Sequence, residues 1–329
     1  MMRIARLRIA VIFGGASNEH DVSCNSARDV IEALDGYDLR LLGIDRAGRW
    51  HEVDTVDDLE TEMDGTRLPD LDGVDVAVPV LHGRFGEDGT VQGLLELAGI
   101  PYTGCGVLAS ALAMDKLMAA TVLRAAGVPV VDGVASTESL PWDFPVFVKP
   151  NRSGSSVGAS RVDSHAGLAT AVAAALEHDG VALVQPVMRG EEVDVGVLQL
   201  ADGTLVTGAP LRVHPSDGAA FFDFEAKYTA GGARFEVPAA LEPEVAERID
   251  RLARKAFTAL GCDGIARVDF FLEADGSLVV NEVNTLPGLT ARSQFPRMFA
   301  EIGMPLAQVL DVLVDRALAV TEGRAILTA

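Results

Sequence analysis

Hydrophobic and polar positions change period several times along the first hundred residues. Continuous apolar runs are typical of buried strands, and the segments between them repeat apolar residues at helical spacing. The runs "RIAVIFGG", "DLRLLGID" and "VDVAVPVLHG" predict strands at 8–15, 38–45 and 74–83, and the spaced patterns predict helices at 19–34 and 89–100. Alternating strands and helices favour a parallel sheet with helices on both faces. We therefore predict an N-terminal α/β domain over residues 1–107.

The pattern is different in the rest of the chain. Residues 144–162 contain two short apolar segments joined by a polar loop rich in glycine and serine, and a helical segment at 165–178 follows. From residue 191 onward the pattern predicts strands, a helix, a hairpin and two further helices. We predict a central domain at 108–190 and a C-terminal domain at 191–329. The fold class is then α/β, becoming α+β in the later domains.

The composition excludes several classes of protein. With 27 Lys and Arg against 48 Asp and Glu, the formal net charge of −21 repels nucleic-acid backbones and anionic membranes. No apolar run approaches the roughly 20 residues of a membrane span, and the apolar stretch near the N-terminus is too short for a secretory signal. Cys24, Cys105 and Cys262 lack CxxC spacing. We expect reduced thiols in a cytoplasmic protein that binds neither nucleic acid nor membrane.

A hairpin near the C-terminus carries candidate metal ligands. In "GIARVDFFLEADGSLVVNEVNT", the Asp-Gly pair at 275–276 predicts a two-residue type I′ turn. Strands joined by this turn pair Asp269 with Glu282, and they pair Arg267 with Asn284 on the same face. Two opposed carboxylates repel unless one is protonated or a cation lies between them. With a carboxamide oxygen beside them, they suit Mg²⁺, which prefers oxygen ligands.

A Mg²⁺ site of this kind usually serves a nucleotide, and other interpretations of the sequence can be weighed against this one. A solvent-facing hairpin with an unspecialised polar face is one, but the apolar flanks "FFLE" and "LVV" argue against it. The match of "GCGVLA" at 104–109 to GxGxxG/A is another, but no clear strand precedes it, so it indicates a turn and a helix start. The P-loop pattern GxxxxGK[ST] is absent.

A candidate phosphate-binding loop follows the strand "FPVFVK". Lys149 ends this apolar strand, and the following "SGSSVG" can offer backbone N–H groups and hydroxyls to phosphate oxygens. The alternative is an ordinary hairpin loop. Lys255, in contrast, lies in an amphipathic helical pattern and is expected to be a solvated surface residue.

Five blocks stand in one order along nearly the whole chain: "FGGASNEHDVS", "LHGRFGEDGTVQGLLELAGIPYTG…MDK", "VKPNRSGSSVG", "FEAKY" and "GIARVDFFLEADGSLVVNEVNTLPGLT". Together they resemble the D-alanine–D-alanine ligases of the ATP-grasp superfamily. The resemblance implies three domains, with ATP and two Mg²⁺ ions, replaceable by Mn²⁺, between the central and C-terminal ones. It implies that ATP phosphorylates the carboxylate of one D-alanine and that the amine of a second attacks the acyl phosphate. A homodimer is also the family's habit.

The resemblance assigns roles to single residues. ATP-binding positions are implied at Lys116, Lys149, Ser155, Ser156, Gln185, Glu192 and Lys227. The Mg²⁺ ligands are implied at Asp269, Glu282 and Asn284. Glu19 would receive the ammonium group of the first substrate near His82, and Ser293 would bind the carboxylate of the second. Arg267 and the backbone of Gly288 would stabilise the tetrahedral oxyanion. Ser155 and Tyr228 would bond with Glu19 and close mobile loops over the site, because an exposed acyl phosphate would hydrolyse.

Several of these positions have a structural alternative. His82 could be a buried histidine at the end of a sheet, Tyr228 could simply pack its loop, and His20 and His214 are expected to be structural or surface residues. A related protein that keeps the scaffold without turnover is a further alternative, but Arg267 and the three metal-ligand positions are all present.

Departures from the family pattern bear on the acceptor. Gln185 stands where many members carry a glutamate near the adenine, and its carbonyl can still accept that hydrogen bond. "TARS" at 290–293 places Arg292 near the second-substrate pocket, and "RSQFPRM" leans toward ligases that use D-lactate or D-serine. Tyr228 favours a dipeptide product, so D-alanine is the expected acceptor, with D-lactate or D-serine as the alternative.

Overall fold

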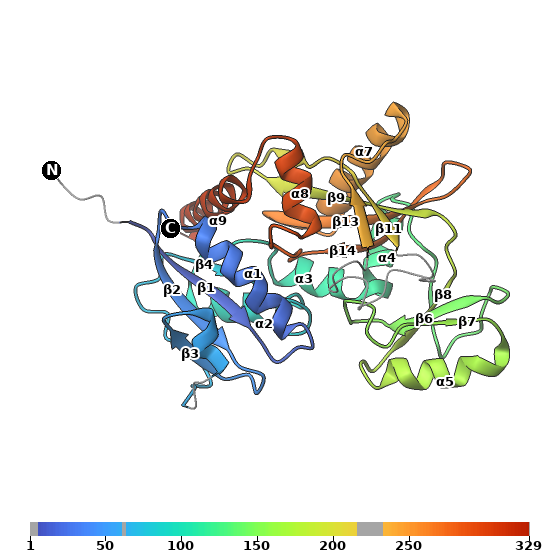
Figure 1. Cartoon of the computed structure of the whole chain (residues 1–329), viewed down its shortest axis with the longest axis horizontal. Coiled ribbons are helices and arrows are strands. Elements are labelled where there is room, and N and C mark those ends of the chain that lie inside the picture. The colour runs from blue at the N-terminus through green and yellow to red at the C-terminus, as the bar shows by residue number, and fades with distance from the viewer. Residues whose placement is uncertain (1–5, 61–63, 216–232, 329) are drawn as a thin grey trace.

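The computed structural model describes residues 6–60, 64–215 and 233–328, and the strands in these ranges form three sheets (Figure 1). The first sheet has the order β3-β2-β1-β4. Strands β1 (Arg8–Gly14), β2 (Asp38–Ile44) and β4 (Val76–Pro79) are parallel, as the sequence predicted.

The prediction of a wholly parallel sheet was wrong at one edge. Strand β3 (Trp50–Val53) runs antiparallel to β2. The chain reverses in a tight turn, in which Gly48 donates its N–H to the carbonyl of Asp45 and has a φ of +79°. Such a short strand has too few residues to show an alternating pattern, so the sequence gives little sign of it.

Alternate residues of β1 contribute to two different cores. The odd-numbered residues pack with α1 (His20–Ala33), and the even-numbered residues pack with α2 (Thr90–Ala98). The helices therefore cover both faces of the sheet, which confirms the prediction. A short 3₁₀ helix, η1 (Val56–Glu60), follows β3.

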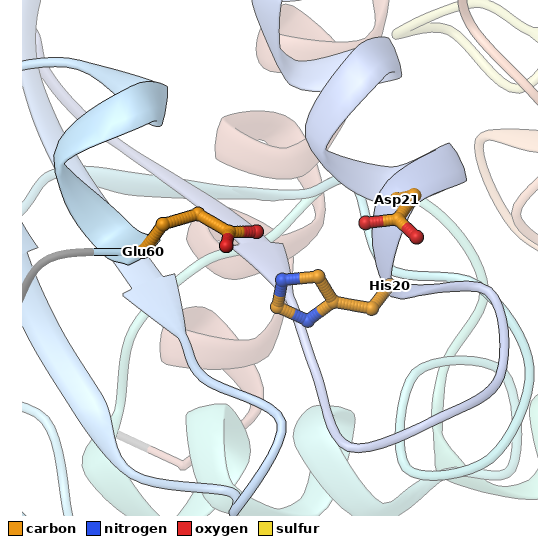
Figure 2. Close-up of side chains that lie close together, drawn as sticks. All are labelled: His20, Asp21 and Glu60. Atoms are coloured by element: carbon orange, nitrogen blue, oxygen red, sulfur yellow. The ribbon is translucent and has the colours of Figure 1, made fainter.

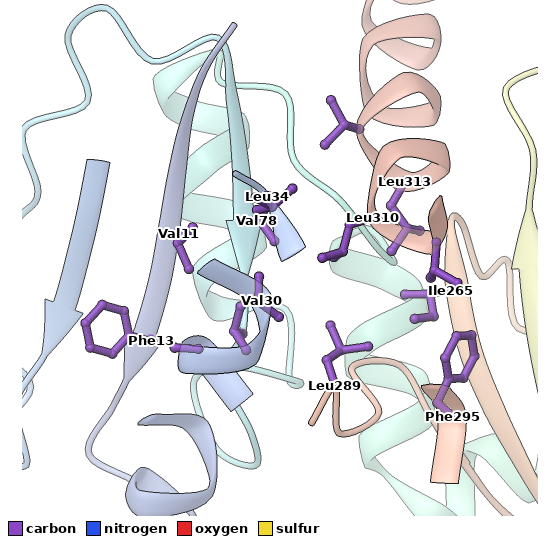
Figure 3. Close-up of a cluster of buried hydrophobic side chains, with 14 of the residues drawn as sticks. Val11, Phe13, Val30, Leu34, Val78, Ile265, Leu289, Phe295, Leu310 and Leu313 are labelled. Carbon is purple, nitrogen blue, oxygen red and sulfur yellow. The ribbon is translucent and has the colours of Figure 1, made fainter. Parts of the chain in front are cut away.

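The two last helices close the first core. In Figure 3, Val30 of α1 and Leu34, which follows that helix directly, belong to the same buried cluster as Leu310 and Leu313 of α9 (Leu306–Thr328). Phe295 of α8 (Gln294–Glu301) lies in this cluster too. Segments from opposite ends of the chain therefore share one hydrophobic core.

The second sheet is small and wholly antiparallel, with the order β5-β8-β6-β7. Its strands are β5 (Val134–Ala135), β6 (Val146–Pro150), β7 (Ser160–Val162) and β8 (Ala182–Pro186). Helix α5 (His165–Leu176) packs on it through small residues such as Ala171 and Ala175. The two strands and the intervening loop expected at 144–162 are confirmed.

The third sheet carries the hairpin. Its main path is β12-β11-β9-β13-β14, with β10 paired to β9. The strands are β9 (Glu191–Gln199), β10 (Leu205–Thr207), β11 (Leu211–Pro215), β12 (Ala233–Glu236), β13 (Ile265–Leu272) and β14 (Leu278–Asn284). One face packs with α3 (Val107–Met114), α4 (Lys116–Ala125) and α7 (Pro243–Ala259). The start of α3 after Gly104, at φ +96°, confirms that "GCGVLA" is a turn and a helix start.

The hairpin pairing was predicted correctly, but its turn was not. Asp269 pairs with Glu282, and Arg267 pairs with Asn284, as expected. The connection is a three-residue loop rather than a two-residue one, because Glu273 and Ser277 face each other across it and Gly276 takes the positive φ of +80°. The resulting one-residue shift is cancelled by a β-bulge, in which Asn281 is the extra residue between two paired positions.

Two further expectations can be compared with the described residues. Cys24, Cys105 and Cys262 are free thiols, and the last two are buried. Among the helices in the described ranges, none combines the length and the apolar character that crossing a bilayer would require.

Candidate active site

A cavity of about 390 Å³ lies between the second and third sheets. Its walls come from the loop after β6, from β8 and β9, and from the hairpin strand β14. The cavity brings together every described residue that was predicted to bind ATP: Lys116, Lys149, Ser155, Ser156, Gln185 and Glu192. Glu282 also lines it, so a predicted metal ligand lies in the same space.

Two lysines enter this cavity from different elements, and each is held by a partner. The Nζ of Lys149, on β6, donates to Oδ1 of Asn281 at 3.3 Å. The Nζ of Lys116, at the start of α4, donates to the carbonyl of Ser153 at 2.8 Å and lies 3.5 Å from Oε2 of Glu282. Asn281 is the bulged residue of β14, and the bulge thus places an amide oxygen where it meets a cavity lysine.

The loop after β6 contains two consecutive serines with positive φ. Ser155 and Ser156 have φ values of +51° and +57°, and Gly158 has a φ of +70°. Non-glycine residues with positive φ are uncommon and are maintained only where neighbouring contacts hold them. Here the hydroxyl of Ser155 donates to the carboxylate of Glu19, and both residues are buried. The bond joins the central part of the chain to the start of α1.

Three carboxylates form a row across three neighbouring strands. Asp194 on β9 pairs with Asp269 on β13, and Asp269 pairs with Glu282 on β14. Asp194 and Asp269 are 0% and 1% exposed. Buried like charges repel strongly, so this arrangement requires compensating cations or donors.

Arg267 supplies one of those cations. Its Nε and Nη2 donate to the two oxygens of Asp269 at 2.7 and 2.8 Å, and its Nε lies 3.9 Å from Oδ2 of Asp194. Burial opposes the charge of the guanidinium, but Asp269 and Asp194 outweigh that effect and raise the pKa of Arg267. Arg267 is therefore a permanent cation held at the centre of the acidic row.

The donor set suits a hard cation such as Mg²⁺. Asn284 donates its amide nitrogen to Oδ2 of Asp269 at 2.9 Å, which leaves its carbonyl oxygen as the atom suited to a metal. The structure also groups Asp269 with carboxylate oxygens that the sequence did not predict as ligands. Oxygens of Glu192, Asp194 and Asp269 lie within 4.8 Å of one another. Carboxylate and carboxamide oxygens therefore converge here from three strands.

Glu19, a predicted first-substrate residue, lies beside the loop after β6. Glu19 is buried beside Gly83, where an added Cβ would come within 2.6 Å of Oε2 of Glu19. His82 has protein partners at both ring nitrogens: Ser26 lies 3.2 Å from Nε2, and the carbonyl of Leu286 lies 3.2 Å from Nδ1. Burial lowers the pKa of His82, against the opposing charge of Glu19, and so favours the neutral ring. These contacts agree with the structural alternative for His82.

Glu87 was not predicted and lies at the same junction. Its carboxylate accepts N–H bonds from Gly83 at 2.7 Å and from Leu286 at 3.3 Å, although the residue as a whole is only partly buried. Burial of the carboxyl group, with the charge of Glu19 as the next cause, raises the pKa of Glu87 to about 8. Its place in the block "GRFGEDG" after a strand end was the available sequence signal.

Ser293 and Gly288, both predicted at the second-substrate end of the site, lie against each other. An added Cβ on Gly288 would come within 2.8 Å of Oγ of Ser293. The Oγ of Ser293 also lies 2.7 Å from the hydroxyl of Thr290. Arg292, expected near the second-substrate pocket, has an exposed side chain. Lys227 and Tyr228 lie outside the described residues, so their predicted positions stay predictions.

His20 belongs to a separate group of polar side chains. Figure 2 shows it between Asp21, its neighbour on α1, and Glu60 of η1. Its Nδ1 lies 2.7 Å from the carbonyl of Gly15, and the ring is buried. This contact fits the structural role expected for His20. His214, also expected to be structural, lies 2.8 Å from Glu236 and forms part of the cavity wall.

Two family models and several known proteins match this chain. Family models described as D-ala D-ala ligase N-terminus and D-ala D-ala ligase C-terminus match residues 8–105 and 122–315. A D-alanine–D-alanine ligase from Nocardia farcinica is 43% identical, over 95% of this chain and 98% of its own length. The chain belongs to the D-alanine–D-alanine ligase family.

Relatives within this family differ in the substrates that their names give. A D-alanine–D-alanine ligase from Mycobacterium tuberculosis is 42% identical, over 96% of this chain and 97% of its own. The structure of the D-alanine–D-alanine ligase from Coxiella burnetii has a TM-score of 0.85 at 29% identity, covering 98% of this chain and 97% of its own. The VanG D-Ala:D-Ser ligase from Enterococcus faecalis has a TM-score of 0.83 at 35% identity, covering 95% and 99%. The ATP-grasp fold is therefore shared by ligases with different acceptors.

Proposed function

We propose that this protein is an ADP-forming D-alanine–D-alanine ligase that supplies a peptidoglycan precursor. The observation that carries the proposal is the cavity in which Lys116, Lys149 and the Ser155–Ser156 turn meet Glu282 of the hairpin. The names of the relatives support the reaction. Catalysis of this kind rests on positioning and charge neutralisation, and it requires no covalent nucleophile from the protein.

The phosphates of ATP would lie among the cations of the cavity. Lys116 and Lys149 would contact phosphate oxygens, and the backbone of the Ser155–Ser156 turn would donate N–H bonds to them. Gln185 would face the adenine, and Glu192 would lie beside the bound nucleotide. Lys227 would reach the γ-phosphate. When bound by Asp269, Glu282 and Asn284, two Mg²⁺ ions, or Mn²⁺ in their place, would supply charge neutralisation for the phosphates.

The first D-alanine would be phosphorylated on its carboxylate. Glu19 would bind its ammonium group, with the Ser155–Glu19 bond holding the loop in place and His82 supporting this end of the site. The γ-phosphoryl group passes to the carboxylate oxygen, and ADP leaves with the pair of electrons from the broken P–O bond. Closing the site excludes the water that would hydrolyse the acyl phosphate.

The second D-alanine would then attack through its amine. Ser293 would bind its carboxylate, and Arg267 with the backbone N–H of Gly288 would stabilise the oxyanion of the tetrahedral intermediate. The intermediate collapses by expelling phosphate, and the amine loses its proton. Tyr228 would form hydrogen bonds with Glu19 and Ser155. The proposal also includes that the protein is a homodimer and that it acts in the cytoplasm, where ATP is made.

Phosphate release tests the proposal. With ATP, Mg²⁺ and D-alanine alone, we expect phosphate and D-alanyl-D-alanine in equal amounts. A D-alanine–D-serine or D-alanine–D-lactate ligase is the second candidate, because the VanG D-Ala:D-Ser ligase is 35% identical and "TARS" departs from the usual pattern. If phosphate release requires added D-serine or D-lactate, that compound is the acceptor in place of D-alanine, and the proposed phosphoryl transfer still holds.

Tyr228→Phe would test the specificity assignment. Loss of the phenolic hydroxyl should weaken closure and let a hydroxy acid compete as acceptor, by roughly the tenfold that one hydrogen bond of about 1.4 kcal/mol represents. The measurement is the ratio of dipeptide to D-alanyl-D-lactate at equal acceptor concentrations. An unchanged ratio would remove Tyr228 from the account of specificity.

A further inference from the structure

Asp194 is a fully buried carboxylate without a role in the proposed reaction. It lies on β9 directly beside Asp269 and is 0% exposed. Its Oδ2 accepts a hydrogen bond of 2.6 Å from Nε2 of Gln294 and lies 3.9 Å from Nε of Arg267. One carboxylate oxygen is therefore close both to the oxyanion-stabilising arginine and to the first residue of α8.

Gln294 follows Ser293, which is the residue proposed to bind the carboxylate of the second substrate. The segment before α8 has a second attachment to a different element, since the N–H of Ala291 donates to Oδ2 of Asp29 on α1 at 2.7 Å. Ser293 thus lies between two acidic anchors that come from different parts of the chain. A short connection held at both ends has little freedom to move.

The body of α8 is seated on the same face of β9. Gly196, two residues after Asp194, leaves the space that Phe295 and Phe299 occupy, with their ring carbons 2.7 and 2.8 Å from an added Cβ. Packing fixes how the helix lies on the sheet, but apolar contacts are not directional. The hydrogen bond from Gln294 to Asp194 adds a directional contact at the end of the helix that carries Ser293.

We propose that Asp194 and Gln294 form a positioning pair that sets the place of Ser293 relative to Arg267, and so orients the second substrate. This inference rests on the proposed function, because it assigns a position to the acceptor of that reaction. A hydrogen bond to a charged, buried acceptor is among the stronger ones in proteins, and its loss also leaves a buried carboxylate short of a donor. Neither residue would touch a substrate.

The test compares Gln294→Ala and Gln294→Met with Gln199→Ala. Methionine keeps the length of the side chain without its donor, so it separates the hydrogen bond from packing. Gln199 lies on the same strand as Asp194, and its amide donates to the carbonyl of Gly203, away from α8, which makes it the matched control. A D-alanine titration at saturating ATP gives separate KM values for the first and second substrates.

For both Gln294 variants we expect the KM of the second D-alanine to rise roughly tenfold or more, with the KM of the first within about twofold. Asp194→Asn keeps an accepting oxygen and should retain more of the wild-type KM for the second substrate than Gln294→Ala does. Gln199→Ala should change neither KM. Equal increases in both KM values, or no increase, would overturn the proposal.

Hydrogen exchange of the protein without substrates provides a readout that needs no turnover. We expect the amides of 290–298 to exchange faster in Gln294→Ala and Gln294→Met, and unchanged exchange there would overturn the pair. If the wild-type protein released no phosphate with any acceptor, the proposed function would fail. The exchange comparison would still support or overturn the pair, so the two failures are distinguishable.

Discussion

The two faces of the third sheet are built from the same strands but differ in polarity. The face toward α3, α4 and α7 is apolar, with Val193, Val268 and Phe270 fully buried. The face toward the cavity and α8 carries Arg267 and the row of three carboxylates. Because successive side chains of a strand point to opposite faces, one strand can supply both a hydrophobic core and a charged site. The charged face is tolerated as long as each buried charge has a partner.

The largest expected effect follows from removing a carboxylate on the polar face. Glu282→Ala takes away a proposed metal ligand and the partner of Lys116, so phosphate release should fall by about 10³-fold or more. The fold should persist, because the change also removes one of several neighbouring negative charges. The measurements are phosphate release and thermal unfolding, with Asp275→Ala in the exposed hairpin turn as control. Near-parent activity would show that Glu282 is not a ligand.

The matching change on the apolar face should act on stability instead. Phe270→Ala empties a fully buried site, and such substitutions cost about 3–5 kcal/mol through lost burial and a residual cavity. Urea unfolding measures this loss, and kcat per folded molecule should stay near the parent value. A large fall in kcat at full folding would mean that the two faces are not separable.

A smaller effect is expected where α8 meets the sheet. Gly196→Ala would place a Cβ 2.7 Å from a ring carbon of Phe295, and overpacking of this kind costs about 1–3 kcal/mol. Gly36→Ala is the control, since nothing lies within 4 Å of its added Cβ. Thermal unfolding of both variants gives the measurement, and the melting temperature of Gly196→Ala should be the lower of the two. Equal melting temperatures would indicate that α8 moves aside without cost.

The last effect depends on pH and concerns the buried carboxyl group of Glu87. The pKa of Glu87 is raised from its ordinary value of 4.5 to about 8, so the folded state holds the proton more tightly than the unfolded one. The contribution of this group to stability is therefore lost as the pH rises between those values. Glu87→Gln cannot ionise, so its melting temperature relative to the parent should increase from pH 5 to pH 9. A constant difference would contradict the raised pKa.

The hairpin shows how far the sequence alone could be followed. Counting residues from Asp275 and Gly276 predicted the pairing of Asp269 with Glu282, and the structure confirmed it. The reasoning contained an error, because the loop has one residue more than predicted. The bulge at Asn281 cancels that error and turns Val280 toward the apolar core, while Glu282 stays on the polar face. The segment "VVNEVN" has no glycine that would mark a bulge, so the bulge is seen only in the pairing of β14 with β13.

The sequence by itself indicated most of the strands and helices, the candidate phosphate loop and the candidate ATP-binding residues, because these depend on local period and on recognisable blocks. Only the tertiary structure decided which distant groups meet. The bond between Gln294 and Asp194 spans 100 residues, and the bond between Leu286 and Glu87 spans 199. Contacts of this kind depend on strand register and on helix packing, which are set by the whole core. Residues such as Asp194 and Glu87 therefore gain their significance only when the chain is folded.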